Sequence, residues 1–246
     1  MNKIDFSNKT VLVIGGSSGI GNGIARRFRD HGAQVFVSGT RASAADYADE
    51  EGSELDGLHY FQWDVSSDRN VEALQPPFDS LDVLVASQGI VEYKRAEFQM
   101  PTFRRVLDVN LMSVMSSCTK FHPMLAKTQG SIIMLGSGAS FFSVLGNPAY
   151  SASKGALVTL TKTLAEAWAG DGIRVNGIAP GLIATKITKV TWGHPRRYQD
   201  SLDSIPMKRW GTPEDMGGIA LFLASPLASY LTGQMLIADG GMSLGL

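Results

Sequence analysis

A tyrosine and a lysine stand four residues apart in the segment Tyr150-Ser151-Ala152-Ser153-Lys154. Residues four apart on a helix share one face, so these two side chains would lie next to each other. A free phenol has a pKa of about 10, and a neighbouring ammonium favours the phenolate and lowers that pKa. The pair therefore predicts an acid/base device in which Tyr150 moves a proton. The same spacing also occurs in ordinary helices, where the tyrosine packs and the lysine reaches solvent, so the context has to decide.

The surrounding residues place the pair at the start of a helix. Pro148 precedes it, and Gly170 and Gly172 end the helical pattern. Within the pattern, apolar residues recur at helical spacing at Ala156, Leu157, Leu160, Leu164 and Trp168. Tyr150 is therefore expected in the first turn, where the N-terminus of a helix stabilises negative charge.

A glycine-rich turn near the start of the chain predicts a nucleotide site. The β-branched apolar run Thr10 to Ile14 leads into Gly15-Gly16-Ser17-Ser18-Gly19-Ile20-Gly21, and a helical pattern then continues to His31-Gly32. A second apolar strand is expected from Gln34 to Ser38, which completes a βαβ unit. The glycines would let the backbone approach a pyrophosphate, and the helix N-terminus would supply N–H donors. A glycine turn with no ligand is the alternative, and the flanking strand and helix argue against it.

Composition points to a small-molecule partner. The chain has 246 residues, enough for one large α/β domain, and its net charge is -1 with 22 basic and 23 acidic residues. This balance of charges shows no excess of basic residues of the kind that binds nucleic acid or an anionic membrane. No apolar run approaches the roughly 18 residues of a membrane span, and residues 1–6 contain no signal-peptide core, so we expect a cytoplasmic protein.

No metal site is expected from the cysteine and histidine content. Cys118 is the single cysteine, and its apolar helical surroundings indicate an inert core thiol. The four histidines, His31, His59, His122 and His194, are scattered without the spacing of metal ligands.

The glycines Gly15, Gly19 and Gly21 are spaced GxxxGxG rather than GxGxxG, and together with the YxxxK pair they resemble the short-chain dehydrogenase/reductase family. The resemblance spans nearly the whole chain, in the single-domain branch of this length. Further family positions follow in order. They are Asp64-Val65 after an apolar strand at 58–63, Asn110, Ser137 at the end of the expected strand Ser131 to Leu135 and thirteen residues before Tyr150, the segment Pro180 to Thr185, Leu231-Thr232-Gly233-Gln234, and the turn Asp239-Gly240-Gly241. The resemblance implies one doubly wound, Rossmann-like α/β domain over residues 1–246, with a mainly parallel sheet of seven strands.

The resemblance also implies roles for individual residues. Tyr150 would be the general acid/base in hydride transfer between a nicotinamide and a carbonyl or alcohol. Lys154 would lower the pKa of Tyr150 and hold the nicotinamide ribose, Ser137 would orient the substrate oxygen, and Asn110 would position a water in the proton relay. The implied cofactor contacts are Gly15, Ser17, Ser18, Gly19, Ile20, Gly21, Thr40, Arg41, Asp64, Val65, Gly89, Tyr150, Lys154, Pro180, Gly181, Ile183 and Thr185. A strand-end cap for Ser137 and a structural role inside a helix for Asn110 are the alternatives.

The residues after the second strand favour NADP(H) over NAD(H). NAD-dependent members of the family usually carry an acidic residue there, which accepts hydrogen bonds from the adenosine ribose. Here the position is Gly39, followed by Thr40 and Arg41, so nothing acidic repels a 2′-phosphate and Arg41 could bind it. Ser18 argues the other way, because many NADP-dependent relatives have a basic residue at that position, and NAD(H) stays possible.

Three departures from the family pattern concern structure more than catalysis. Ile14 replaces a usual threonine, and Ala86-Ser87-Gln88-Gly89 replaces Asn-Asn-Ala-Gly. Pro76-Pro77 should cut short the helix before the strand that ends at Ala86.

The sequence says less about the substrate and the oligomeric state. A long irregular segment is expected at 186–210, interrupted by Gly193, Pro195 and Pro206. Together with the apolar residues Phe141, Phe142, Val144 and Leu145 it favours an apolar, moderately bulky ketone bound under a lid. The alternative is that the aromatic residues only pack this segment onto the body of the protein. Apolar helix faces at 102–127 and 149–169 agree with the family expectation of a homotetramer or dimer. The alternative functions are a 3-oxoacyl-thioester reductase of fatty-acid synthesis and a nucleotide-sensing protein without catalysis.

Overall fold

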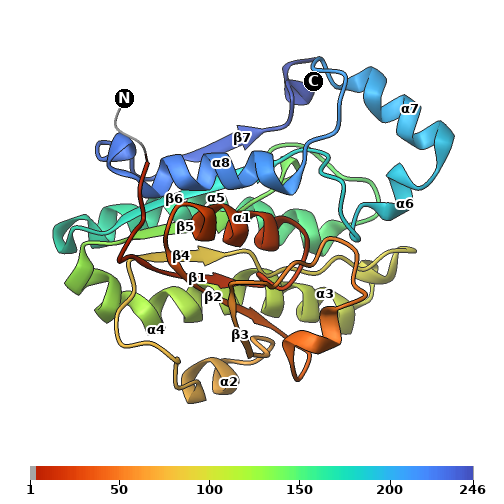
Figure 1. Ribbon diagram of the computed structural model, residues 1–246. Helices are drawn as coiled ribbons and strands as arrows, with labels where there is room; N and C mark the ends of the chain where they lie inside the picture. The colour runs from red at the N-terminus through yellow and green to blue at the C-terminus, as the bar shows by residue number, and fades with distance from the viewer. Residues whose placement is uncertain (1–3, 246) are drawn as a thin grey trace.

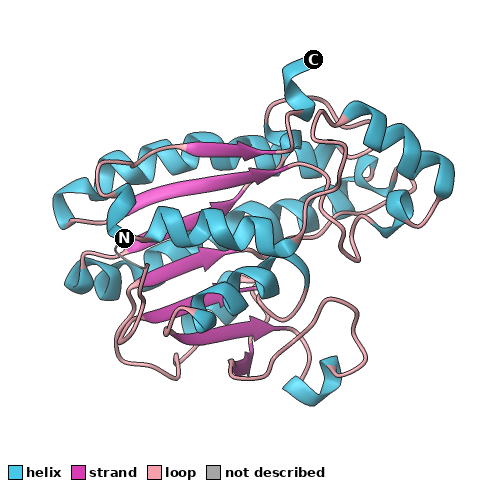
Figure 2. Cartoon of the chain, turned by 45° about the horizontal axis from the view of Figure 1, so that its top comes forward, coloured by secondary structure: helices cyan, strands magenta, loops and turns pink. Residues whose placement is uncertain are grey.

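The computed structural model describes residues 4–245, and within them seven parallel strands form one sheet (Figures 1 and 2). The strands are Thr10–Ile14 (β1), Gln34–Gly39 (β2), His59–Gln62 (β3), Val83–Ala86 (β4), Ser131–Leu135 (β5), Arg174–Pro180 (β6) and Met235–Ala238 (β7). Their order is β3-β2-β1-β4-β5-β6-β7, and all neighbouring pairs are parallel. The direction of winding reverses between β1 and β4, so the ligand site of such a fold is expected outside the carboxyl ends of these two strands.

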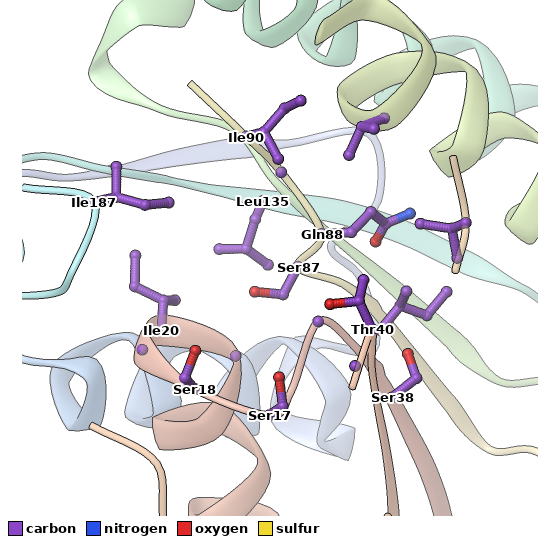
Figure 3. Close-up of a pocket in the computed structure, with 18 of the residues that line it drawn as sticks. Ser17, Ser18, Ile20, Ser38, Thr40, Ser87, Gln88, Ile90, Leu135 and Ile187 are labelled. Carbon is purple, nitrogen blue, oxygen red and sulfur yellow. The ribbon is translucent and has the colours of Figure 1, made fainter. Parts of the chain in front are cut away.

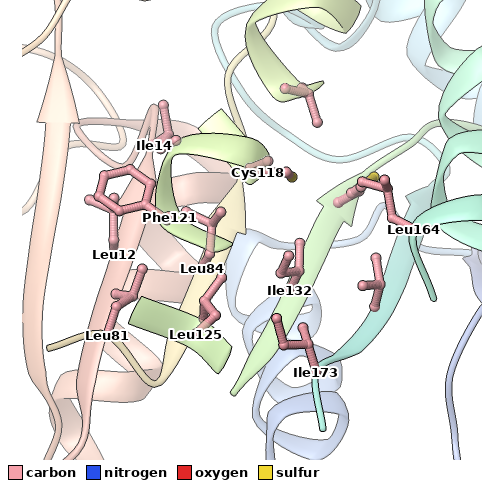
Figure 4. Close-up of a cluster of buried hydrophobic side chains, with 14 of the residues drawn as sticks. Leu12, Ile14, Leu81, Leu84, Cys118, Phe121, Leu125, Ile132, Leu164 and Ile173 are labelled. Carbon is pink, nitrogen blue, oxygen red and sulfur yellow. The ribbon is translucent and has the colours of Figure 1, made fainter. Parts of the chain in front are cut away.

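Helices cover both faces of the sheet, which confirms the doubly wound fold. On one face, α1 (Gly19–Asp30) and α8 (Pro213–Ala224) pack on the sheet around a core that contains Ile24, Phe28 and Leu221. On the other, α2 (Asp68–Ala73), α4 (Ser113–Thr128) and α5 (Pro148–Trp168) enclose the second core, which Figure 4 shows around Leu84, Phe121 and Ile132. Strands buried on both faces read as continuous apolar runs, which is why β1 and β5 have the bounds that the sequence predicted.

The chain before α4 carries a local irregularity at a predicted catalytic residue. Helix α3 (Met100–Leu107) passes through a π-helical turn, Asp108–Met112, directly into α4. Asn110 lies in that turn and is fully buried. Widened turns of this kind are often found at functional sites, because they re-aim a side chain within a continuous helix.

Two predictions about helices have opposite outcomes. The short α2 ends before Pro76-Pro77, as expected. The prediction of an irregular segment at 186–210 was wrong, because the segment contains α6 (Lys189–Trp192) and α7 (Pro195–Ser204). Pro195 begins α7 instead of breaking it, since the first helical position has no N–H to lose. Figure 1 shows both helices beyond the arrowhead ends of the strands.

No helix among residues 4–245 is long and apolar enough to cross a membrane. Residues 1–3 and 246, which belong to the predicted domain and bear on the expected lack of a signal peptide, lie outside the described residues. Cys118 is buried in the core around α4, as predicted.

Candidate active site

A cavity of about 620 Å³ opens at the carboxyl ends of the central strands (Figure 3). Its volume falls within the range typical of ligand pockets, about 300 to 1,000 Å³. The predicted residues that line it are Gly15, Ser17, Ser18, Gly19, Ile20, Gly21, Thr40, Arg41, Asp64, Val65, Gly89, Tyr150, Lys154, Pro180 and Thr185. Gly181 and Ile183 lie outside this lining, because Gly181 packs against Asp239 and the buried Ile183 bridges to Gly211.

The glycine-rich turn between β1 and α1 is built so that only glycine fits. Gly15 and Gly19 have φ angles of +73° and +59°, a region that favours glycine. A Cβ on Gly21 would lie 2.3 Å from the carbonyl oxygen of Gly15 and 2.9 Å from the Ser87 hydroxyl. The three glycines also line the cavity, so the turn has no side chains there to keep a pyrophosphate away from its backbone.

Replacing Gly21 by alanine should therefore weaken dinucleotide binding by about tenfold or more and destabilise the fold by about 1 to 3 kcal/mol, the usual cost of overpacking. The clash is with backbone, which cannot rotate away. Fluorescence titration with NADPH and thermal unfolding would measure both effects. Gly218→Ala is the matched control, because a Cβ there meets nothing within 4 Å and alanine favours the helix. Equal behaviour of the two variants would contradict the close-approach argument.

A loop that sequence analysis did not single out lies against the glycine turn. The N–H of Gly19 donates to the carbonyl of Gly52 at 2.9 Å, and the Ser53 hydroxyl donates to the Ser17 carbonyl at 2.7 Å. The side chain of Asn22 pairs with both backbone groups of Glu54. The loop between β2 and β3 therefore fixes the start of α1 and borders the cavity.

Asn110 is held by an amide pair with the loop after β4. Its Oδ1 accepts from the N–H of Ile90 at 2.8 Å, and its Nδ2 donates to the Ile90 carbonyl at 2.9 Å and to the Ser153 hydroxyl at 3.2 Å. A Cβ on Gly89 would lie 3.5 Å from Oδ1 and 3.4 Å from Nζ of Lys154. Asn110 therefore connects the β4 loop to α5 and has one lone pair of Oδ1 left for a water.

The side chains of Ser137 and Tyr150 contact each other at the edge of the cavity. Ser137 follows β5, and its hydroxyl accepts from the N–H of Ala139 and also forms a hydrogen bond with the Tyr150 hydroxyl. Tyr150 lies in the first turn of α5, as predicted. A substrate oxygen placed between the two hydroxyls would contact both of them.

The expectation that Lys154 lowers the pKa of Tyr150 is wrong for this structure. Burial raises the pKa of Tyr150, the hydrogen bond from Ser137 lowers it, and the nearby Tyr93 and Glu97 raise it further. Nζ of Lys154 is 5.8 Å from the centre of the tyrosine ring and donates to the carbonyl of Leu135 at 2.7 Å. The ammonium is therefore directed at the end of β5, and desolvation governs the phenol.

Lys154 is itself perturbed. The side chain is 5% exposed, and burial lowers its pKa from an ordinary 10.5 to about 8. A lysine with such a pKa exchanges protons near neutral pH far more readily than a surface lysine.

The part of the cavity lined by Thr40 and Arg41 also contains an acidic residue that sequence analysis missed. Glu50, nine residues beyond Arg41, folds back to line the same cavity, and its side chain is only 13% exposed. Its carboxylate accepts from Nη2 of Arg41 and lies 2.7 Å from Nζ of Lys186. The hydrogen bonds from Lys186 and Arg41 hold the pKa of Glu50 below its ordinary value. The view that nothing acidic stands here therefore needs correction.

Two further groups near the chemistry were missed. Tyr93 donates from its hydroxyl to the carbonyl of Ile187 at 2.5 Å and so connects the β4 loop to the segment at 186–210. Glu97 is fully buried against the first turn of α5. Neither has a sequence signature, because each is defined by partners 50 or more residues away. Among residues 4–245, no three His, Cys, Asp or Glu side chains gather in a way that could hold a metal ion.

A family model described as enoyl-(acyl carrier protein) reductase, one of the short-chain dehydrogenase/reductase models, matches residues 15–243. The chain belongs to the short-chain dehydrogenase/reductase family. It is an NAD(P)-dependent oxidoreductase that acts between alcohols and carbonyls. Both the predicted family and the predicted fold are thereby confirmed.

Relatives of this short-chain dehydrogenase/reductase act on several substrates. It is 38% identical over 244 residues to 2-dehydro-3-deoxy-D-gluconate 5-dehydrogenase of Bacillus subtilis, with 96% of this chain and 95% of that protein covered. It is 35% identical to the 3-oxoacyl-[acyl-carrier-protein] reductase FabG of Chlamydia pneumoniae, with coverage of 98% and 99%. A crystal structure from Beutenbergia cavernae, provisionally assigned as an NAD(P)-dependent gluconate 5-dehydrogenase with bound NADP, is 35% identical, with a TM-score of 0.86 and coverage of 98% and 99%.

Proposed function

We propose that this enzyme reduces a ketone to a secondary alcohol, or the reverse, with NADP(H), and that Tyr150 is its general acid/base. The observation that carries this proposal is the meeting of Tyr150 and Lys154 in the lining of the cavity, with Ser137 bonded to the tyrosine and Asn110 next to the lysine. When bound, the nicotinamide supplies or accepts the hydride. A nucleotide-sensing protein would have no use for this set of groups, so we prefer an enzyme to that alternative.

The protein residues handle the proton. In the reductive direction the Tyr150 hydroxyl donates its proton to the substrate oxygen, which the Ser137 hydroxyl holds by a hydrogen bond. Burial keeps the phenol protonated, which suits an acid. Lys154 lies behind the tyrosine with a pKa of about 8 and can return a proton near neutral pH. A water on the free lone pair of Asn110 Oδ1 would complete the route toward solvent.

The proposal of NADP(H) is supported by two cations that converge on one carboxylate. Arg41 and Lys186 both pair with Glu50 in the lining of the cavity. Glu50 could itself accept hydrogen bonds from the adenosine ribose, as the acidic residue of NAD-dependent members does, so binding of NADP(H) requires its carboxylate to move away. A 2′-phosphate would then be the anion between the two cations, and Arg41 can bind it through two N–H groups. The NADP bound to the relative from Beutenbergia cavernae agrees with this choice.

Replacing Arg41 by alanine should therefore weaken NADPH binding by about tenfold or more, since a hydrogen bond to a charged group is worth about 1.5 to 3 kcal/mol. NADH binding should change little. Fluorescence titrations of Arg41→Ala with NADPH and with NADH would measure both affinities. The exposed Arg196→Ala is the control. Tighter binding of NADH than of NADPH by the parent protein would reject the cofactor proposal and leave the chemistry intact.

A panel of substrates separates the remaining alternatives. The Bacillus relative is named for a sugar-acid substrate, whereas the exposed Phe141, Val144 and Leu145 near Ser137 favour an apolar ketone. The FabG relative favours an acyl-thioester. Sugar acids and polyols with NADP⁺, and apolar ketones and 3-oxoacyl thioesters with NADPH, would be compared by kcat/KM. Absence of turnover with every class would support the sensor.

We also propose a cytoplasmic homotetramer, or a dimer built from the same helices. Met112, the last residue of the π-helical turn, and Met115, in the first turn of α4, are 49% and 37% exposed, although α4 otherwise packs in the core. Analytical ultracentrifugation measures the oligomeric state, and a monomer at micromolar concentration would reject this part of the proposal.

A further inference from the structure

A carboxylate is buried beneath the catalytic helix, where charge is costly. Glu97 is 0% exposed, in the short 3₁₀ turn Ala96–Phe98 that follows β4. Its Oε1 accepts from the N–H of Glu92 at 3.0 Å and from Nδ2 of Asn147 at 3.2 Å, and its Oε2 accepts from the N–H of Tyr150 at 2.9 Å. Each of these partners is a donor, so the side chain acts as an acceptor throughout, which is the hydrogen-bonding role of a carboxylate.

Glu97 takes over the capping of α5 from the residue at the usual position. Asn147 is the N-cap, and an asparagine there normally accepts from the third residue of the helix, here Tyr150. The side chain of Asn147 makes no such bond and donates to Glu97 and to the carbonyl of Glu92. The backbone of the catalytic tyrosine is therefore held by a residue 53 positions earlier in the chain.

The segment before Glu97 is strained. Lys94 and Arg95 have φ angles of +59° and +61°, in the left-handed region that costs most residues about 1 to 2 kcal/mol each. Backbone strain and a buried charge thus occur within four residues of each other, beside the reacting tyrosine. Such costs persist where the surrounding structure enforces them, and they are concentrated at functional sites.

We propose that Glu97 is a positioning residue for Tyr150: its carboxylate fixes the first turn of α5 against the β4 loop and places a negative charge next to the backbone of the reacting tyrosine. This inference rests on Tyr150 being the acid/base of the proposed function. The groups that act on the Tyr150 phenol are Ser137, by a hydrogen bond, and Tyr93 and Glu97, by their charge, and Nζ of Lys154 lies 5.8 Å from the centre of the ring. Among them Glu97 is the buried acid, and a negative charge nearby disfavours the phenolate. Tyr93, on the same loop, reaches the carbonyl of Ile187, so the anchored loop also connects α5 to the segment at 186–210.

Two substitutions separate the effect of the charge of Glu97 from the effect of its hydrogen bond to the backbone of Tyr150. Glu97→Gln keeps the shape and removes the charge, so the limb of the kcat/KM pH profile that reports Tyr150 should move to lower pH. Glu97→Asp keeps the charge but is too short to hold the N–H of Tyr150, so the limb should stay and kcat should fall by roughly tenfold to a hundredfold, the range of a misplacement near 1 Å. Binding of NADPH should be unchanged in both variants, because Glu97 does not line the cavity.

Glu92→Gln is the matched control, since it makes the same change on the same loop and its carboxylate pairs with Arg105 instead of α5. A readout independent of turnover is the ultraviolet absorbance of phenolate during a pH titration, taken as the difference between each protein and its Tyr150→Phe counterpart. A Glu97→Gln titration identical to that of the parent would overturn the proposal. If this variant does not fold, Glu97→Asp with unchanged kcat overturns it as well. Should Tyr150→Phe retain turnover, the proposed function fails instead.

Discussion

Tyr150→Phe is expected to lower turnover by about 10² to 10⁴-fold, the usual contribution of a positioned acid or base. The phenyl ring keeps the shape of the first turn of α5 but cannot donate a proton or bond to Ser137. NADPH affinity should be nearly unchanged, because the glycine turn, Arg41 and Lys186 are untouched. Steady-state kinetics on the best substrate, together with fluorescence titration, would measure the two quantities separately.

Tyr230→Phe is the control for this loss, since that side chain is fully exposed and far from the cavity lining. Turnover of Tyr150→Phe within a few-fold of the parent would show that another group supplies the proton. A loss of NADPH binding in parallel with turnover would instead mean that the Tyr150 hydroxyl contributes to cofactor binding, because phenylalanine keeps the ring.

The site was predictable where it depends on local sequence. Gly15, Gly19 and Gly21 are required by backbone geometry within one turn, and Tyr150 and Lys154 by one helical repeat. Such short-range patterns leave a signature in the chain. The strands β1 and β5, which are buried on both faces, were predicted to the residue for the same reason.

The groups that sequence analysis missed depend on contacts between distant segments. Glu50 reaches the cavity because a loop folds back over α1, and Glu97 reaches α5 across 53 residues. The prediction that Lys154 lowers the pKa of Tyr150 was wrong because two residues on the same helix face can direct their side chains to different places. The side chain points to the carbonyl of Leu135, and burial, which no spacing reveals, outweighs the charge.

The two buried charges beside Tyr150 act at different points of its chemistry. Glu97 lies at the backbone end of the tyrosine and opposes ionisation, whereas Lys154 lies one turn later and exchanges protons with a pKa of about 8. An acid flanked in this way holds its proton until a substrate oxygen is in place, and the lysine can then restore it. Burial of the Lys154 ammonium costs stability, which links the activity of the site to a penalty in folding.

Lys154→Met tests this link between activity and stability, and we expect it to cause a large loss of turnover. We expect turnover to fall by about a hundredfold or more, because the proposed return of a proton by Lys154 is lost. The free energy of unfolding at pH 7 should change by less than about 2 kcal/mol. Burial of the ammonium costs about 3 kcal/mol, since a pKa that falls from 10.5 to about 8 is worth about 1.4 kcal/mol per pH unit. Removing that cost offsets the loss of the bond to the Leu135 carbonyl, about 1 to 3 kcal/mol.

The pH dependence of stability gives this prediction its sign. The folded-state pKa of Lys154 is about 8 and the ordinary value is 10.5, so between these two pH values the unfolded chain binds a proton that the folded chain has released. The free energy of unfolding therefore rises with pH in that window for the parent and not for Lys154→Met. Chemical denaturation at pH 7 and pH 10 should show the parent gaining on the variant, while the exposed Lys162→Met shows no such change. If the free energy of unfolding changed equally with pH in the parent and in Lys154→Met, Lys154 would not be desolvated. Its proposed role in returning the proton near neutral pH would then be wrong as well.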